Sequence, residues 1–244
     1  MIELLLLGTS VGLLSGLFGI GGGTILVPLL LLLGYETKIA IGISVVQMVF
    51  SSMYGSYLNH KKGTLDILMV AIIGLGGFCG ALFSGSITSS FSDKTLEIVF
   101  LAFATFALLR LFMKTRDYTH EKKVNKIVLF IIGFVIGAIS MSIGVGGSLI
   151  LVPILVGFLH VPLKKATSAG LFFVVFSSVS GLISHTLHGH IDYESGIIIG
   201  LASLIGVYAG IHIKHHILDV AVQRKLLIVL YLFIVLYLFY RIFG

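Results

Sequence analysis

The sequence predicts an all-α polytopic membrane protein made of two homologous repeats, and three observations support this fold class. First, 57% of the 244 residues are hydrophobic and only 11% are charged, whereas a soluble domain carries about 25% charged residues. Second, the apolar stretches are long and continuous, unlike the alternating strands of about 10 residues in a membrane barrel. Third, the chain contains an internal duplication. Helices are the expected spanning form, because each helix satisfies its own backbone hydrogen bonds in lipid.

The duplication is centred on a glycine-rich motif. Residues 19–30 read GIGGGTILVPLL, and 125 positions later residues 144–155 read GVGGSLILVPIL, with eight of twelve positions identical. Because Gly, Pro and Ser recur at fixed offsets, chance similarity between apolar helices does not explain the match. Further matches occur at a spacing of 126: Val49 to Ser52 with Val175 to Ser178, Gly80 with Gly206, and Asp93 with Asp219.

Each repeat contains four apolar blocks. The first is a long run broken by the glycine cluster, and the other three have the length of a membrane span, about 17–25 residues. The predicted blocks are 2–34, 37–58, 65–87 and 95–113, and then 127–159, 166–184, 195–213 and 225–243. The predicted domains are a first transmembrane repeat at 1–113, a basic cytoplasmic linker at 114–126 and a second transmembrane repeat at 127–244.

The distribution of basic residues favours one of two alternative topologies. If each broken run crosses the membrane once, the repeats are parallel and the 16 Lys and Arg residues divide nine to seven. If each run turns back at its glycines, the repeats are inverted, and one side keeps only Lys38, Lys94 and Arg241 of the 16. The positive-inside rule favours the inverted arrangement, with both termini outside. A straight helix of 33 residues would also measure about 50 Å, far more than a hydrocarbon core of about 30 Å.

The two glycine clusters are the main candidates for a binding site. Inverted repeats with broken helices place their substrate where half-helix ends meet near the middle of the membrane. A helix N-terminus there offers unpaired N–H groups and roughly half a positive charge, and glycines let a small anion approach the backbone. The alternative is that the glycines only allow close helix packing. That role is expected for Gly8, Gly12, Gly16, Gly76, Gly80, Gly133, Gly137, Gly206 and Gly210, because of their small-xxx-small spacing.

Polar residues inside the apolar spans complete the candidate site. Ser44, Gln47 and Ser51 share one helix face, and a buried Gln47 is costly without a partner. Serine hydroxyls have an alternative role, since they can donate to carbonyls of their own or a neighbouring helix. The predicted substrate-binding residues are Gly19, Gly21, Gly22, Gly23, Thr24, Gln47, Ser51, Ser52, Gly144, Gly146, Gly147, Ser148, Ser177 and Ser178.

Histidines near the span ends are candidates for a proton relay. His60 follows the second block of the first repeat, and His185 and His188 follow its counterpart; we single out His60 and His185. A location in the headgroup region is the alternative for these side chains. Interfacial positions are also expected for His212, His215 and His216, which have no neighbouring carboxylate or Cys to form a metal site, and for Tyr231, Tyr237 and Tyr240.

The duplicated motif Gly-x-Gly-Gly-Gly/Ser-x-Ile-Leu-Val-Pro, present once in each half, resembles the TauE/SafE sulfite exporter family. The resemblance covers essentially the whole chain. It implies transport of sulfur oxyanions or organosulfonates, such as sulfite, thiosulfate, sulfoacetate or taurine-related compounds, across a bacterial or archaeal plasma membrane. Ser148 replaces the third glycine of the second copy, so the two half-sites are chemically unequal. The motif positions carried over are Gly19, Gly21, Gly22, Gly23 and Pro28, and Gly144, Gly146, Gly147 and Pro153.

The leading functional hypothesis is a secondary carrier for a small anion that works by alternating access around the two half-helix N-termini. A passive anion channel is the second hypothesis, and a non-transport membrane subunit or enzyme that needs a partner is the third. No cofactor is expected, since the sequence has no ATP-binding loop, and no catalytic or metal-binding pattern is recognisable. The expected partners are the anionic substrate and the lipid bilayer, with a homo-oligomer left open and nucleic acid not expected. The expected location is the prokaryotic inner membrane.

Overall fold

A computed structural model describes residues 1–18, 21–60, 67–112, 125–157, 159–161, 163–216 and 220–244 of the chain. In these residues every regular element is a helix, which confirms the predicted all-α fold. Six segments of the described chain are long and apolar enough to cross a membrane. The predicted linker at 114–126 lies outside the described residues except for its last two positions.

The helices follow the predicted blocks closely, and each broken run forms two short helices. The first half contains α1 (Ile2–Phe18), α2 (Gly23–Leu32), α3 (Thr37–His60), α4 (Ile67–Ala81), α5 (Ser84–Ser90) and α6 (Asp93–Phe112). The second half contains α7 (Lys126–Ser142), α8 (Ser148–Gly157), α9 (Leu163–Leu187), α10 (Tyr193–His216) and α11 (Val220–Phe243).

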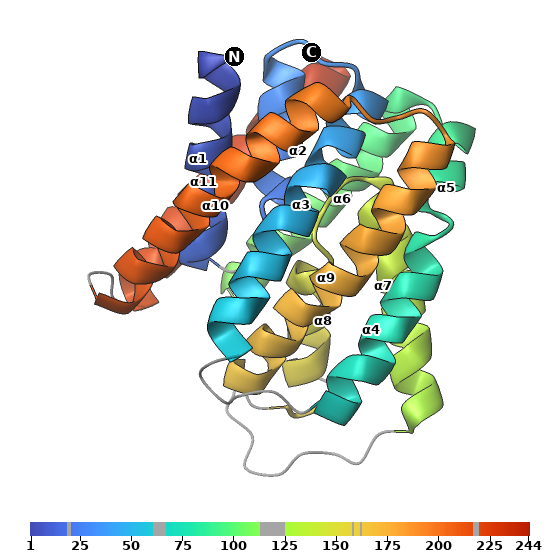
Figure 1. Ribbon diagram of the computed structural model, residues 1–244, viewed down its shortest axis with the longest axis vertical. Helices are drawn as coiled ribbons and strands as arrows, with labels where there is room; N and C mark the ends of the chain where they lie inside the picture. Colours follow the sequence, from blue (N-terminus) through green and yellow to red (C-terminus); the bar gives the residue numbers. More distant parts are fainter. Residues whose placement is uncertain (19–20, 61–66, 113–124, 158, 162, 217–219) are drawn as a thin grey trace.

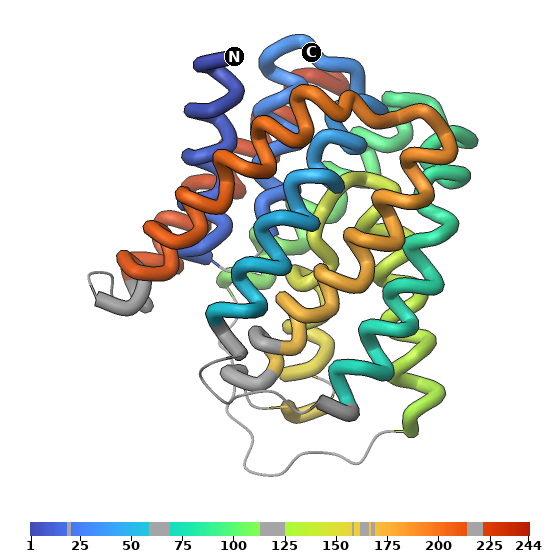
Figure 2. The backbone as a smooth tube through the Cα atoms, in the orientation of Figure 1, coloured from blue at the N-terminus to red at the C-terminus, as the bar shows by residue number. Residues whose placement is uncertain are grey.

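The broken runs form two hairpins at opposite ends of the bundle (Figure 1). Helix α1 runs inward from the end that holds the N-terminus, and α2 returns toward that same end. Helix α7 runs inward from the opposite end, and α8 returns toward it. Figure 2 shows the same path as a tube, with both termini at one end of the molecule. The two hairpin tips therefore lie inside the bundle, between its ends.

Glycines bring two helix pairs into backbone contact, as their spacing predicts. In α1, a methyl group added at Gly12 would collide with the carbonyl oxygen of Ser203 in α10. In α4, a methyl group at Gly80 would collide with the carbonyl oxygen of Phe134 in α7. Such contacts allow the short distances and van der Waals packing on which helix association in lipid depends. The same kind of contact is made by Gly8, Gly16, Gly76, Gly133, Gly137, Gly206 and Gly210.

These two helix pairs join the halves of the chain. Helix α1 of the first half lies against α10 of the second, and α7 of the second half lies against α4 of the first. Helix α10 of the second half thus holds the first helix of the first hairpin, α1. In the same way, α4 of the first half holds the first helix of the second hairpin, α7. The halves are interlaced, so the bundle does not divide into two separate lobes.

The predicted span at 65–87 corresponds to the apolar segment Met69–Ser90, which is interrupted between α4 and α5. The Ser184 hydroxyl of α9 donates to Leu82 O (2.6 Å) and accepts from the Gly85 N–H (2.9 Å). This side chain takes the place of regular backbone hydrogen bonds, which is a known cause of helix kinks. The corresponding α10 is continuous over Tyr193–His216.

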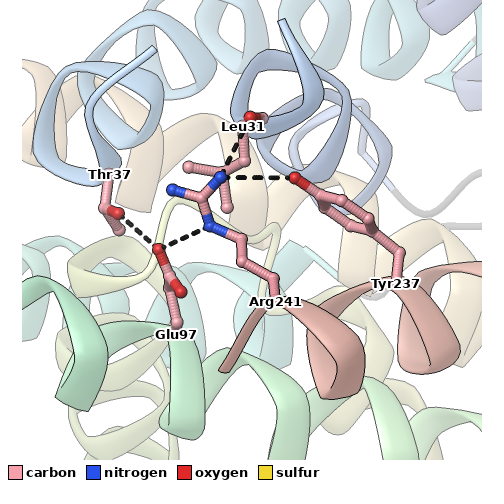
Figure 3. A network of polar contacts seen from close by, with 5 residues as sticks. All are labelled: Leu31, Thr37, Glu97, Tyr237 and Arg241. Carbon is pink, nitrogen blue, oxygen red and sulfur yellow. Dashed lines mark hydrogen bonds and ion pairs between the residues drawn. The ribbon is translucent and has the colours of Figure 1, made fainter. Parts of the chain in front are cut away.

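A polar network closes the outer end of the α2 hairpin (Figure 3). Arg241 of α11 donates from Nε to Glu97 Oε1 (3.1 Å) and from one terminal nitrogen to Leu31 O (3.1 Å) and the Tyr237 hydroxyl (3.4 Å). Thr37 Oγ1 donates to the same Glu97 oxygen (2.8 Å). The network adds a side-chain donor to Leu31 O, which also accepts from the Gly34 N–H (3.2 Å), in the last turn of α2, where intrahelical donors run out.

The expectation that Tyr231 is an interfacial anchor is wrong. Its side chain is only 1% exposed and belongs to the core shared by α2, α3 and α11. Tyr240 is 75% exposed, as an interfacial side chain would be.

The close contact of α1 with α10 gives a first test. We expect Gly12→Ala to destabilise the protein by roughly 1–3 kcal/mol, because the methyl group meets backbone atoms that have no room to move. Gly55→Ala in α3 is the matched control: its methyl group would meet nothing within 4 Å, and alanine favours helix over glycine by about 1 kcal/mol. Thermal unfolding in detergent measures both. Equal melting temperatures for the two variants would contradict the backbone contact.

Candidate functional site

The tip of the second hairpin is built by a helix-ending glycine. Gly144 has a left-handed backbone (φ 67°), its N–H donates to Met141 O (3.3 Å), and the Val145 N–H donates to Ser140 O (2.8 Å). This pair of hydrogen bonds is the Schellman motif, which ends a helix and satisfies its last carbonyls. The break predicted at this cluster is therefore confirmed, and α8 starts only four residues further on, at Ser148.

The tip of the first hairpin is formed by the first copy of the glycine motif, as the tip of the second hairpin is formed by the second copy. Helix α1 ends at Phe18, and the predicted site residue Gly19 lies outside the described residues. Gly21 again has a left-handed backbone (φ 72°), and Gly22 precedes the first residue of α2 without a side-chain cap. The local conformation that turns the chain is thus supplied by glycine in both tips.

The structure brings the two tips together. A methyl group added at Gly21 would lie 3.6 Å from Cα of Gly146, and one at Gly23 would collide with Gly144 O. The Ser44 hydroxyl of α3 donates to that same carbonyl oxygen (2.7 Å). Residues of both glycine clusters therefore occupy one buried region, which neither hairpin could form alone.

Two helix N-termini begin in this region. In α2 the N–H groups of Ile25 and Leu26 donate to Gly22 O at 3.1 and 2.9 Å; in α8 those of Ile150 and Leu151 donate to Gly147 O at 3.2 and 2.9 Å. The backbone N–H groups just before these donors have no intrahelical acceptor, as at any helix start. Together with the helix dipoles they make the region electropositive without a cationic side chain.

Gln47 is the most informative side chain of the site. It is 0% exposed, and its amide lies so close to Gly22 that a methyl group there would collide with it. Neither Oε1 nor Nε2 has a hydrogen-bond partner among the described residues. A buried polar group left without a partner costs about 1–3 kcal/mol. The amide is thus available to a ligand or water at the start of α2.

The second half places different chemistry at the matching position. Phe173, which corresponds to Gln47 in the repeat, packs against Gly147, where a methyl group would lie 2.7 Å from the ring. Ser140 Oγ would lie 2.9 Å from that methyl group, and it too has no partner in the described part of the chain. Sequence reasoning missed Ser140, although the repeat holds a signal: Ser15 lies 125 positions earlier, as Gly19 does from Gly144.

A second pair of matching positions exchanges small and large residues between the halves. In the first half a methyl group at Gly23 would meet Ser44 Oγ at 2.6 Å; in the second half one at Gly170 would meet Ser148 Cβ at 3.0 Å. The hydroxyl thus comes from the spanning helix in one half and from the hairpin in the other. Volume is preserved while the position of the polar group changes.

The remaining predicted polar residues divide into two groups. Ser51, Ser177 and Ser178 donate to carbonyls of their own helices, at 3.5 Å to Met48 O, 3.0 Å to Phe173 O and 3.3 Å to Val175 O. These bonds are the alternative role that serine has in apolar helices. In contrast, Ser52 Oγ and Thr24 Oγ1 are buried without a partner in the described residues, although Thr24 lies beside the Tyr231 hydroxyl.

Of the two relay candidates, only His185 can be placed. His60 is the last residue of α3, and its side chain lies outside the described set. His185 is 0% exposed; its Nε2 lies 3.0 Å from Met141 O and its Nδ1 lies 3.2 Å from Nδ1 of His190. Sequence reasoning did not single out His190, although His185, His188 and His190 form a short run on and after the end of α9.

The environment of His190 disfavours its charged form. Burial lowers the pKa of His190, and the positive charges of Lys38 and His188 lower it further. The side chain lies in the turn between α9 and α10, outside the spans.

Sequence comparison places the chain among known proteins. The family profile described as "Sulfite exporter TauE/SafE" matches residues 4–238. This chain belongs to the TauE/SafE sulfite exporter family. Similar curated proteins include the probable membrane transporter proteins YunE of Bacillus subtilis (25% identical; 78% of this chain and 80% of YunE) and MJ0441 of Methanocaldococcus jannaschii (27%; 75% and 71%). No solved structure matches the chain. The TauE/SafE protein is therefore a multi-pass membrane protein of a transporter family.

The contact between Gly22 and Gln47 can be tested in this TauE/SafE protein by a double-mutant cycle. We expect Gly22→Ala to destabilise the fold by forcing the Gln47 amide away, and Gln47→Ala to restore the loss, with a coupling free energy of roughly 0.5–3 kcal/mol. Thermal unfolding of the four proteins measures it. Gly23→Ala is the control. Gln47→Ala should not restore the stability lost in Gly23→Ala, because the methyl group at position 23 collides with a backbone oxygen. Additive effects of Gly22→Ala and Gln47→Ala would contradict the contact.

The lowered pKa of His190 predicts the direction of a pH effect. The unfolded chain binds a proton at His190 near the ordinary value of about 6.5, and the folded chain binds it at lower pH, so the stability from this group is lost as pH falls below about 6.5. The melting temperature should decrease from about pH 7 to about pH 5, and less so in His190→Gln, in which the amide retains a donor and an acceptor. A steeper decrease in His190→Gln would refute this.

Proposed function

We propose that this TauE/SafE protein is a secondary carrier of a small anion and not an enzyme, and that the anion binds between the two hairpin tips. The observation that supports this most directly is the buried amide of Gln47, which lacks a partner among the described residues and lies against Gly22 at the start of α2. A ligand that brings its own acceptor atoms would relieve the cost of that unpaired donor.

The proposed ligand is held mainly by the backbone. Donors at the starts of α2 and α8 and the Gln47 Nε2 group match the oxygens of an oxyanion, because helix N-termini bind anions without a buried Lys or Arg. Ser140 and Thr24 add hydroxyls that are buried without a partner in the residues described. The other predicted residues, Gly144, Gly146 and Ser148, shape the second tip. Ser51, Ser177 and Ser178 donate to their own helices, so we assign them no direct contact.

The proposed mechanism is alternating access. We interpret the hairpins as equivalent parts of two inverted repeats, with both termini outside, one hairpin entering from each side of the membrane. The anion then lies where their tips meet, and movement of one hairpin and its helices against the other would expose the anion to each side in turn. A passive channel with the same site is the alternative.

The family name supports the substrate class. We propose a sulfur oxyanion or an organosulfonate, which presents several oxygens around one sulfur atom to the converging donors. The apolar composition and the curated relatives support a location in the prokaryotic cell membrane.

The site predicts a specific loss of anion binding. We expect sulfite, thiosulfate or a simple alkanesulfonate to raise the melting temperature of the purified protein, since a ligand that binds the native state stabilises it. Gln47→Leu should weaken the binding of that anion by about tenfold or more, because a buried hydrogen bond of about 1–3 kcal/mol is lost. Gln223→Leu in α11, the same change at the other glutamine of the chain, should leave the anion's effect unchanged.

The outcomes separate the proposals. If none of these anions stabilises the protein, or if Gln47→Leu and Gln223→Leu change the anion's effect equally, the proposed binding site is wrong. In liposomes, uptake that saturates and is accelerated by the same anion inside would support a carrier, whereas currents that rise in proportion to the anion concentration would support a channel.

A further inference from the structure

A cluster of histidines lies where four helices meet at the end of the bundle that holds the chain termini. His185 comes from α9, and His188 and His190 come from the turn that follows it. The rings of His185 and His190 have centroids 5.4 Å apart, and those of His188 and His190 are 6.0 Å apart. Around them lie α5 with Ser86 and Ser89, the start of α3, and the end of α7.

Hydrogen bonding determines the tautomer of each ring. Met141 O can only accept, so His185 Nε2 carries a hydrogen and donates to it. In neutral His185, Nδ1 is then an acceptor, and the hydrogen between the two Nδ1 atoms belongs to His190. The Nε2 atom of neutral His190 in turn accepts from the Ser89 hydroxyl at 3.2 Å. A continuous chain of hydrogen bonds thus runs from Ser89 through both rings to Met141.

The outer end of this chain can exchange protons with water. Ser89 is exposed, His190 is 7% exposed and His185 is fully buried. A proton from water can bind His190 Nε2 if the Ser89 hydroxyl rotates from donor to acceptor, with no movement of heavy atoms. His190 can then pass its Nδ1 hydrogen to Nδ1 of His185 and become neutral again. His185 carries the charge in that state and keeps its hydrogen bond to Met141.

The inner end of the chain lies next to the anion site. Met141 is three residues before Gly144, about 4.5 Å along a helix, and its carbonyl also accepts from the Gly144 N–H. The C-terminal end of a helix carries a partial negative charge that stabilises a cation. A positive charge on the histidine pair would be favoured there, and more so with an anion at the adjacent tips.

We propose that His185 and His190 form a proton-binding site that is filled together with the anion. The anion in this statement is the one of the proposed function, on which the inference rests in part. The charged and titratable groups that face the pair are Lys38 from α3 and His188 from the turn after α9, both of which oppose protonation; α5 and α7 contribute hydroxyls and a carbonyl. Without an anion the proton is therefore weakly held, and an anion offsets the repulsion.

Binding of the proton and the anion must then be reciprocal. If the anion strengthens proton binding by some factor, the proton strengthens anion binding by the same factor. For one proton taken up with each anion, the affinity for an anion whose own charge is constant rises by up to about tenfold for each unit that the pH falls. An alkanesulfonate meets that condition, because it stays ionised where histidine titrates.

The proton site can be tested without knowing the substrate. In the full-length protein, labelled with ¹⁵N-histidine and placed in lipid nanodiscs, ring signals are followed between about pH 8 and about pH 5, the range of histidine titration. We expect the His185 and His190 signals to change together, and His190→Gln to abolish or displace the change at His185. His212→Gln, an exposed histidine of α10, is the matched control and should leave both signals unaffected. Independent titration of the two rings, or a constant His185 signal, would overturn the shared proton.

A second measurement tests the link to the anion. With an alkanesulfonate that stabilises the protein, the shared titration should move to higher pH, and binding should strengthen as pH falls in the wild type and in His212→Gln but not in His190→Gln. An anion that binds without moving the titration would overturn the coupling. If no anion binds at all, the proposed function fails, and the nuclear magnetic resonance titration alone still decides whether the pair holds a proton.

Discussion

Two helices begin and two helices end inside an apolar bundle, and each such end exposes polar backbone groups that lipid cannot satisfy. The carbonyl groups at the end of α7 have several hydrogen-bond donors. The N–H groups of Gly144 and Val145 donate to them in the Schellman motif, His185 donates to Met141 O, and Ser44 donates to Gly144 O. The start of α2, at Gly22, has no side-chain cap to accept from its N–H groups. The imbalance leaves the centre of the molecule rich in donors, which is the property that an anion site requires.

The sequence predicted the parts of this arrangement that depend on local conformation or on the repeat. Glycine is the residue that permits the left-handed backbone at positions 21 and 144, so the hairpin tips could be placed. Spacing of small residues identified the helix faces that touch. The break between α4 and α5 could not be predicted, because it depends on Ser184 from a helix far along the chain. Tyr231 was misplaced for a related reason: an aromatic residue of an apolar helix is interfacial or buried according to its neighbours, and Tyr231 lies in the middle of α11, in the core.

The two halves share a backbone plan but differ in chemistry. Gln47 and Phe173 occupy matching positions against Gly22 and Gly147, and the hydroxyl of Ser44 in one half is replaced by that of Ser148 in the other. A duplicated fold tends to produce a symmetric site, and these substitutions remove the symmetry. The amide side offers a hydrogen-bond donor and the ring side a flat apolar surface, so a ligand would meet the two tips in different ways.

The interlaced helix pairs also constrain how the protein is made. Helix α1 leaves the ribosome well before α10, yet the surface that accepts its glycines is on α10. Until then the face of α1 that carries Gly8, Gly12 and Gly16 has only lipid or insertion machinery to cover it. Contacts between segments so distant in the chain form slowly, and exposed unpaired surfaces favour misassembly. The nascent first half is thus an unfinished intermediate during biogenesis, and its completion waits for the synthesis of α10.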